Sequence, residues 1–289
     1  PGNGLTARLD GKALCGGNDT FIGTTAPVSA EMKAQAAALA EAGKTPLWFS
    51  YDGRLLGVVA VWEMLGCIGV RARLFLSLPS ALLAVAAPLL ARFCPGALYP
   101  LYLVYGLYLL FASVLFYSKT EFVTLAKTAF TMLFVTFGFA SLVLVRDAEP
   151  LRYLLIFVAA WSTDTFALFA GKLFGRRKLC EHISPKKTVA GAVGGVIGCI
   201  AAFAVYALAV GLLYDIWETW ENYLLLALLA VCGSLVSMLG DLAASVIKRA
   251  FGVKDYGNIF PGHGGVLDRF DSILPLGIAA AALLAVNAL

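Results

Sequence analysis

Charged residues, histidines and paired cysteines are all scarce in this sequence. Only 14% of the 289 residues are charged, whereas a soluble globular domain has roughly 25%. The six cysteines are scattered without a CxxC pair, so we expect reduced thiols and no structural zinc site. These shortages exclude an ordinary soluble enzyme, a disordered chain and a disulfide-stabilised scaffold.

Apolar residues are abundant, at 60% of the chain, and the mean hydropathy is +0.84. Stretches of about 20 apolar residues are long enough to cross a bilayer as helices. Seven such stretches are present: 74–91, 98–117, 122–145, 151–171, 189–214, 223–247 and 272–289. A shorter apolar piece at 55–69 reads as the remnant of an eighth. The fold class is therefore an all-α polytopic membrane protein with about seven transmembrane helices.

Residues 1–57 differ in composition from the rest of the chain. Ser29 can cap a short helix over 30–42, and a strand over 45–50 is followed by a turn at Asp52-Gly53 and a second strand from Leu55. We expect a short N-terminal α/β fragment, 1–57, joined to an integral membrane domain, 58–289. The first 25 residues have no apolar signal-peptide core, and the start at Pro1 suggests a fragment or a processed product.

The basic residues fall mainly on one side of the predicted spans, and such a bias marks the cytoplasmic side. The opposite side receives only Arg92, Arg146 and Arg152. We therefore expect a multi-pass protein of the cell (inner or plasma) membrane with loops 172–188 and 248–271 in the cytoplasm. The net charge of +4 reflects this loop bias, and no nucleic-acid partner is expected.

Three carboxylates stand at the end of the sixth span and just beyond it. Asp241, Ser245 and Lys248 share one helix face, and a carboxylate inside an apolar span is costly unless it is paired or binds a cation. Asp268 and Asp271 can converge on the same point. We expect Asp241, Asp268 and Asp271 to bind Mg²⁺ or another hard divalent cation that holds a polyphosphate, with a second cation left open. The simpler alternative is a solvated helix end followed by a glycine-rich turn.

The segment from Ser245 to Asp271 resembles the signature of the phosphatidate cytidylyltransferase family, S-x-x-K-R-x4-K-D-x-G-x2-[LIF]-P-x-H-G-G-x-x-D-R-x-D. The matching residues are Ser245, Lys248, Arg249, Lys254, Asp255, Gly257, Phe260, Pro261, His263, Gly264, Gly265, Asp268, Arg269 and Asp271. The segments 161–167 and 184–188 also resemble that family. The resemblance covers about residues 58–289.

This resemblance implies the transfer of CMP from CTP to phosphatidate, which yields CDP-diacylglycerol and pyrophosphate for phospholipid synthesis. The implied catalytic residues are Asp241, Lys248, Arg249, Lys254, His263, Asp268, Arg269 and Asp271. The implied substrate-binding residues are Ser184, Lys186, Lys187, Thr188, Ser245, Asp255, Gly264, Gly265 and Asp164. For Asp164 and His263, a structural pairing and a loop-stabilising role are equally open.

One departure from the family stands out: Ala190 occupies a position where the family usually has a glutamate. That loss could weaken substrate positioning. The family also usually has further transmembrane sequence before residue 58.

Residues 1–57 instead resemble the end of the nucleotide-binding domain of heavy-metal P-type ATPases, through Gly2-x-Gly4 and the segment 41–55. The ATPase motifs DKTGT, CPC and GDGxND are absent from the sequence. We interpret this as a junction of two unrelated reading frames near residues 55–62, with a genuine accessory domain as the alternative.

Other functions remain as alternatives. A related membrane enzyme could act on an isoprenoid or ether lipid with the same nucleotide chemistry, and the chain could be an inactive truncated fusion. A transporter or ATPase fragment would leave the signature unexplained. A homodimer is compatible with the intramembrane polar groups, which need a protein-lined cavity.

Overall fold

The computed structural model describes residues 4–9, 12–17, 48–50, 56–181, 183–214, 220–257 and 264–287. The chain divides into two compact units, Pro1–Leu56 and Gly57–Leu289. The division therefore falls one residue before the boundary drawn from the sequence. Each unit is described by itself.

The first unit contains a three-stranded antiparallel sheet in the order β1-β2-β3. Its strands are β1 (Gly4–Leu9), β2 (Lys12–Gly17) and β3 (Trp48–Ser50). The strand predicted over 45–50 is confirmed at 48–50, whereas β1 and β2 were not anticipated. The predicted helix over 30–42 and the Asp52-Gly53 turn lie outside the described residues.

The strand predicted from Leu55 onward is wrong, because helix α3 (Leu56–Cys67) occupies this stretch. Its apolar run is interrupted only by Glu63 and shows no alternation of polar and apolar positions, and such a run suits a buried helix as well as a strand. The helix ends where Gly69, at φ 74°, lets the amide of Val70 reach the carbonyl of Leu65 at 3.0 Å.

Six helices of the described chain are long and apolar enough to cross a membrane. They are α4 (Leu74–Phe93), α5 (Leu98–Leu115, preceded by the 3-10 turn Pro95–Ala97), α6 (Phe122–Ala148), α7 (Pro150–Phe174), α8 (Val189–Tyr214) and α9 (Trp220–Ala250). The first six predicted spans are thus confirmed. The seventh is realised as the shorter helix α11 (Ile273–Asn287), with 15 residues. Residues 288 and 289 lie outside the described chain.

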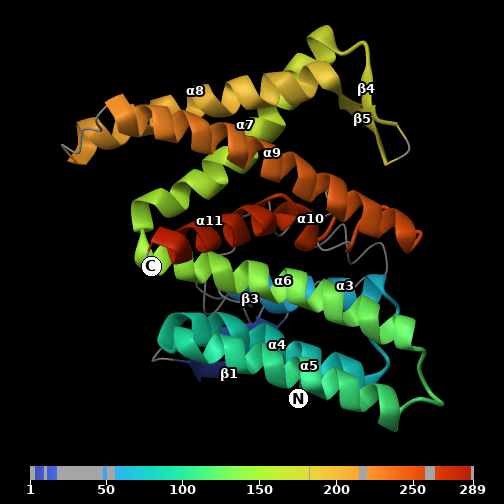
Figure 1. Ribbon diagram of the computed structural model, residues 1–289. Coiled ribbons are helices and arrows are strands. Elements are labelled where there is room, and N and C mark those ends of the chain that lie inside the picture. Colours follow the sequence, from blue (N-terminus) through green and yellow to red (C-terminus); the bar gives the residue numbers. More distant parts are fainter. Residues whose placement is uncertain are drawn as a thin grey trace. The chain divides into compact units, whose positions relative to one another are not determined.

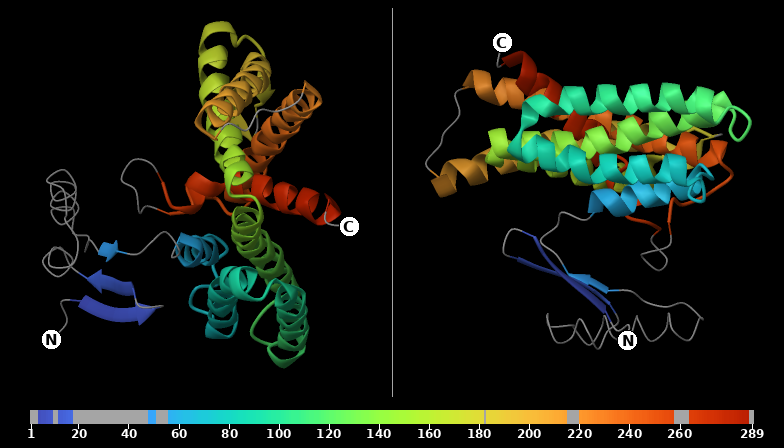
Figure 2. Two further views of the ribbon diagram at one scale, coloured as in Figure 1. Left: turned by 90° about the vertical axis from the view of Figure 1, so that its left-hand side faces the viewer. Right: turned by 90° about the horizontal axis from the view of Figure 1, so that it is seen from below.

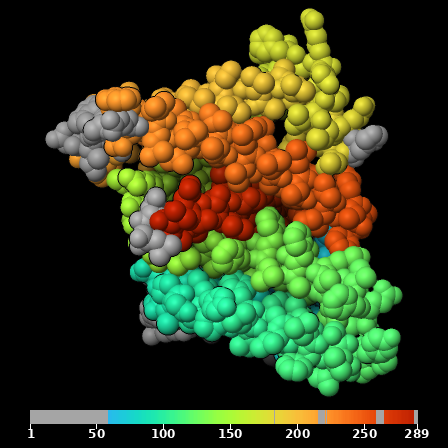
Figure 3. Space-filling view, in the orientation of Figure 1, coloured from blue at the N-terminus to red at the C-terminus, as the bar shows by residue number. Residues whose placement is uncertain are grey.

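The helices of the second unit form two groups around α11 (Figures 1 and 2). One group contains α4, α5 and α6, and the other contains α7, α8 and α9. Helix α11 packs against both α6 and α9, and Figure 3 shows it between them on one face of the molecule. The fold therefore brings α11 between the two halves, with the residues just before α11 and its first turn against the C-terminal half of α9.

Helices α7 and α8 form the closest pair, because glycines line their contact. A Cβ at Gly191 would lie 2.8 Å from the carbonyl oxygen of Ala167, and one at Gly195 would lie 3.0 Å from that of Thr163. Small residues spaced by four let membrane helices approach closely. This contact holds the start of α8, and the short hairpin before it, against the end of α7.

Helix α9 ends in the same way as α3. Gly252, at φ 69°, follows its last turn, and the amide of Val253 reaches the carbonyl of Lys248 at 3.0 Å. The chain then returns toward the helix at Tyr256, so that the residues after α9 lie beside its last two turns. This return positions the site described next.

Candidate active site

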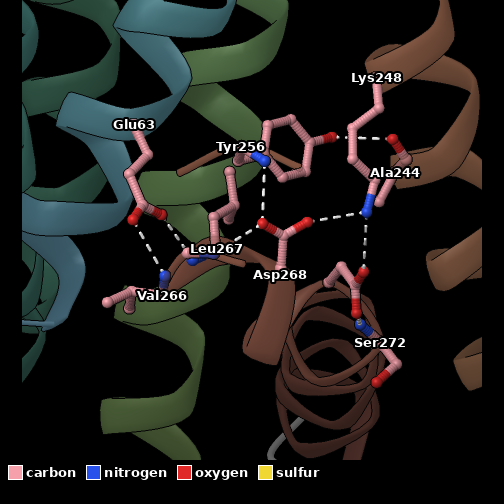
Figure 4. A network of polar contacts seen from close by, with 10 residues as sticks. Glu63, Ala244, Lys248, Tyr256, Val266, Leu267, Asp268 and Ser272 are labelled. Carbon is pink, nitrogen blue, oxygen red and sulfur yellow. Dashed lines mark hydrogen bonds and ion pairs between the residues drawn. The ribbon is translucent and has the colours of Figure 1, made fainter. Parts of the chain in front are cut away.

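Lys248, in the last turn of α9, lies between the two carboxylates of the following segment (Figure 4). Its Nζ is 2.8 Å from Oδ1 of Asp268 and 3.7 Å from Oδ2 of Asp271. Their side chains are only 12%, 6% and 13% exposed, in that order. Buried charges of this kind persist in proteins when they are paired and hydrogen-bonded. The predicted convergence of Asp268 and Asp271 is thus present, around a lysine.

Asp268 is a carboxylate whose two oxygens both have partners. Lys248 donates to Oδ1, and the backbone amides of Tyr256 and Gly265 donate to Oδ2 at 2.8 and 2.9 Å. Gly264 adopts φ 84°, a left-handed conformation that favours glycine, and a Cβ there would lie 2.9 Å from Oδ2 of Asp268. Asp268 therefore ties the residues on both sides of 258–263 to the end of α9.

Tyr256 completes this cluster. Its hydroxyl donates to the carbonyl of Ala244 at 2.9 Å, and its ring lies 5.1 Å from Nζ of Lys248. Burial, with the nearby carboxylates Asp271 and Asp268, raises the pKa of the Tyr256 hydroxyl far above its usual range. The tyrosine is consequently neutral, and its ring packs against the ammonium group of Lys248.

A second ion pair joins the other half of the site. Lys187 lies in the hairpin of β4 (Lys178–Cys180) and β5 (Ser184–Thr188), and its Nζ is 2.5 Å from Oδ2 of Asp241 on α9. These side chains are 24% and 27% exposed, so this pair is more open than the first. Asp164, on α7, is exposed and interacts electrostatically with both partners.

Asp271 belongs to the Lys248 cluster and is near enough to Asp241 to be repelled by it. Its Oδ1 accepts a hydrogen bond from the amide of Ser272 at 2.9 Å. Burial is the main cause that raises the pKa of its carboxyl to about 7, and repulsion from Asp241, Asp164 and Asp268 adds to it while Lys248 opposes it. A nearby cation would therefore stabilise the charged form of this carboxylate.

The predicted metal ligands are not assembled as a group. Within the described ranges, no three His, Cys, Asp or Glu side chains are placed to hold one metal ion. Asp268 is occupied by three donors, whereas Asp241 and Asp271 keep unengaged lone pairs. This arrangement suits Mg²⁺, which is usually held by one or two carboxylates while substrate phosphates and water complete its shell.

The remaining residues expected in the second loop have different surroundings. The Oγ1 of Thr188 accepts the amide of Gly191 at 3.1 Å and so caps α8. The Thr188 hydroxyl keeps its own O–H donor, so its expected contact with phosphate stays a prediction. Lys186 is exposed, and Ser184 is half-buried.

The other predicted residues differ in their exposure. Arg249, Lys254, Asp255 and Arg269 are exposed, and Ser245 is half-buried on α9. Gly265 gives its amide to Asp268, so that amide does not point to a ligand. His263 lies outside the described residues, and its expected role stays a prediction.

Sequence reasoning missed two residues of this region, Tyr256 and Glu63. Glu63 is 2% exposed on α3, and its carboxylate accepts the amides of Val266 and Leu267 at 3.0 and 2.8 Å (Figure 4). The available signal was that Glu63 is the only charged residue between positions 55 and 70. An isolated charge in an apolar helix is a candidate for function.

Known proteins resemble this chain over most of its length. The sequence model of the family described as "Cytidylyltransferase family" matches residues 36–287. The match begins at residue 36, inside the N-terminal unit, whereas the resemblance described from the signature segment begins at about residue 58. The resemblance of residues 1–57 to a P-type ATPase gains no support from these comparisons and stays a prediction.

Curated relatives carry the name phosphatidate cytidylyltransferase. The protein of Staphylococcus saprophyticus is 38% identical over 172 residues, 58% of this chain and 63% of the relative. The protein of Brucella abortus is 42% identical over 156 residues, which are 53% of each chain. The protein of Staphylococcus epidermidis is 37% identical over 234 residues, 77% of this chain and 85% of the relative.

The chain thus spans less than two thirds of the length of the first two relatives. The family match nevertheless covers more than half of the chain and includes the six spans and the carboxylate–lysine cluster. This chain is a multi-pass membrane protein and belongs to the Cytidylyltransferase family.

Proposed function

We propose that this chain transfers the cytidylyl group of CTP to phosphatidate, giving CDP-diacylglycerol and pyrophosphate. The observation that carries the proposal is the joint placement of Lys248, Asp268 and Asp271 beside the Lys187–Asp241 pair at one end of α9. The names of the curated relatives support the same reaction.

The proposed reaction suits a site without a strong base. A phosphate oxygen of phosphatidate bonds to the α-phosphorus of CTP, and the bond from that phosphorus to the bridging oxygen of the β-phosphate breaks. The nucleophile is already an anion, so the barrier comes from bringing two polyanions together and from charge on the leaving pyrophosphate. Positioned cations lower both contributions.

Two lysines of this chain are placed for that task. Lys248 is held by Asp268 and Asp271, so its ammonium is fixed in position. Lys187 is held by one bond to Asp241 in a more open place, so it can turn toward a substrate phosphate. The exposed Arg249 and Lys254, and Arg269 with them, supply further positive charge in the same segment of the chain.

A divalent cation, with Mg²⁺ as the first choice, is part of this proposal. Asp241 and Asp271 are its proposed protein ligands, and Asp164 lies near enough to interact with both. When bound, the cation would neutralise triphosphate charge. Asp268 was expected as a third ligand, and the three donors on its oxygens favour a role in holding Lys248 and the loop.

We also propose that the catalytic end of the bundle faces the cytoplasm. The six spans alternate sides, and the loops 172–188 and 248–271 carry ten of the 17 lysines and arginines between positions 58 and 289. A membrane-impermeant thiol reagent on intact cells should fail to label Cys180 and should label it in inverted vesicles.

A homodimer remains part of the proposal. The exposed Asp164 projects from a membrane-spanning helix, where a carboxylate needs a polar surrounding. Chemical cross-linking of the full chain in membranes should give a species of twice the mass. If only the monomer is found, the proposal of a homodimer is wrong.

The reaction is tested by offering the purified full chain CTP with a panel of acceptors. Phosphatidate, its ether-linked analogue and an isoprenyl phosphate are compared at equal surface concentration, and lipid products are identified by mass spectrometry. We expect CDP-diacylglycerol as the main product. A higher kcat/KM for the isoprenyl acceptor, or no lipid product, would contradict the proposal.

A further inference from the structure

Glu63 is a buried carboxylate that the proposed reaction does not use directly. It belongs to α3, about 200 residues before the signature segment, and is 2% exposed. Carboxylates are almost never buried to this extent without compensating partners. The partners of Glu63 therefore indicate its task.

Those partners are two successive backbone amides of the signature segment (Figure 4). Val266 donates to Oε1 at 3.0 Å and Leu267 donates to Oε2 at 2.8 Å. The preceding amide, of Gly265, donates to Asp268. Three consecutive amides are thus each bonded to a carboxylate oxygen, directly before the residue that holds Lys248.

Two signature glycines make room for this carboxylate. A Cβ at Gly257 or at Gly265 would lie 2.6 Å from Cδ of Glu63. Real Cβ atoms do not approach other carbons so closely, and Glu63 is held by two hydrogen bonds, so it cannot move away without losing them. The need for glycine at these two positions is therefore steric and comes from Glu63.

We propose that Glu63 is a positioning residue for cytidylyl transfer, whose carboxylate fixes residues 264–268 so that Asp268 and Asp271 hold Lys248 in place. The inference rests on the proposed function. Glu63 acts through the backbone and through Asp268, and it contacts no substrate.

The first test replaces Glu63 by glutamine, which has the same shape. Its amide group can accept only one of the two N–H donors, so one of them is left unsatisfied. We expect kcat per folded enzyme to fall about 10- to 100-fold, the usual effect of removing a residue that orients a catalytic group. The KM for each substrate should change much less, because Glu63 touches neither. Glu121→Gln, at an exposed position before α6, is the matched control and should keep full activity.

The second test uses the steric relation. Gly265→Ala alone should lower kcat by a similar factor, because its methyl group displaces the Glu63 carboxylate. In a chain that already carries Glu63→Ala, the same substitution should cause little further loss. Such non-additivity marks two groups in direct contact. Fully multiplicative losses would overturn the proposed relation.

Hydrogen exchange on the full chain separates this inference from the proposed function. In Glu63→Gln, exchange of the peptide spanning 264–268 should rise about tenfold, and that of α8 should not change. A lower melting temperature with unchanged kcat per folded enzyme would reduce Glu63 to a purely structural residue and overturn the inference alone. Absence of cytidylyl transfer by the unmodified chain would overturn both the proposed function and the role of Glu63 in it. Unchanged exchange of residues 264–268 in Glu63→Gln would show that Glu63 does not hold this segment, and would overturn the inference.

Discussion

The two ion pairs near the end of α9 differ in how firmly they are held. Lys248 and Asp268 are 12% and 6% exposed, and Asp268 accepts three hydrogen bonds. Lys187 and Asp241 are 24% and 27% exposed and share one contact. A buried, saturated pair organises its surroundings, whereas an open pair can exchange its partner for substrate or a cation. The site thus combines a fixed half and an adaptable half.

The largest effect is expected in the fixed half. Lys248→Met leaves Asp268 and Asp271 buried without their counter-charge, and breaking such a pair costs about 3 to 5 kcal/mol. Both cytidylyl transfer and the melting temperature of the detergent-solubilised protein should fall sharply. Lys248→Arg, which keeps the charge, should retain more stability. Unchanged melting of Lys248→Met would contradict the account of the fixed half.

In the adaptable half, Asp241→Asn should separate activity from stability. We expect cytidylyl transfer to fall by about 100- to 1,000-fold, as for the loss of one group that stabilises a transition state. Stability should change by no more than about 1 kcal/mol, because the pair is partly exposed. Activity assays and thermal melting of the same preparation measure both. A large loss of stability would remove the distinction between the two halves.

Lys187→Ala sharpens the same comparison with a smaller effect. It removes one cation from the open pair, and we expect activity to fall about 10- to 100-fold with little change in melting. A raised KM for CTP would place the lysine on the triphosphate, whereas a raised KM for phosphatidate would place it on the lipid. Wild-type kinetics would exclude Lys187 from the site.

The smallest effect is expected at the C-terminal end of α6, away from the cluster, where Arg92 of α4 contacts Asp147 at 3.0 Å. These side chains are 46% and 22% exposed, so Asp147→Asn should change stability by less than about 1 kcal/mol. Cytidylyl transfer should stay at the wild-type level. Loss of activity in this variant would mean that an ion pair away from the site affects cytidylyl transfer as much as those within it.

Periodicity and length predicted the spans well, because a long apolar helix in a membrane protein has few alternatives. For 55–69 they gave two readings, a strand and the remnant of a span, and helix α3 agrees with the second, since a short apolar run fits a strand or a buried helix equally. The last predicted span, 272–289, corresponds to α11, which has 15 residues within the described part of the chain.

For the site, local spacing correctly brought Asp268 and Asp271 together around one point. It could not predict that Asp268 accepts hydrogen bonds from the amides of Tyr256 and Gly265, because every residue except proline has a backbone amide and the sequence does not show where it donates. Contacts across long separations, such as Glu63 with Val266, depend on how α3 packs against the segment after α9. No local pattern reports such packing.

The central claim is tested most directly by following the two ends of CTP. The full chain in phosphatidate-containing vesicles with Mg²⁺ receives CTP labelled at the α-phosphate in one reaction and at the γ-phosphate in the other. We expect the α-label to enter the lipid fraction and the γ-label to appear in pyrophosphate, and both signals to disappear on chelation of the cation. Release of γ-labelled inorganic phosphate without lipid labelling, or no turnover by well-folded protein, would contradict it.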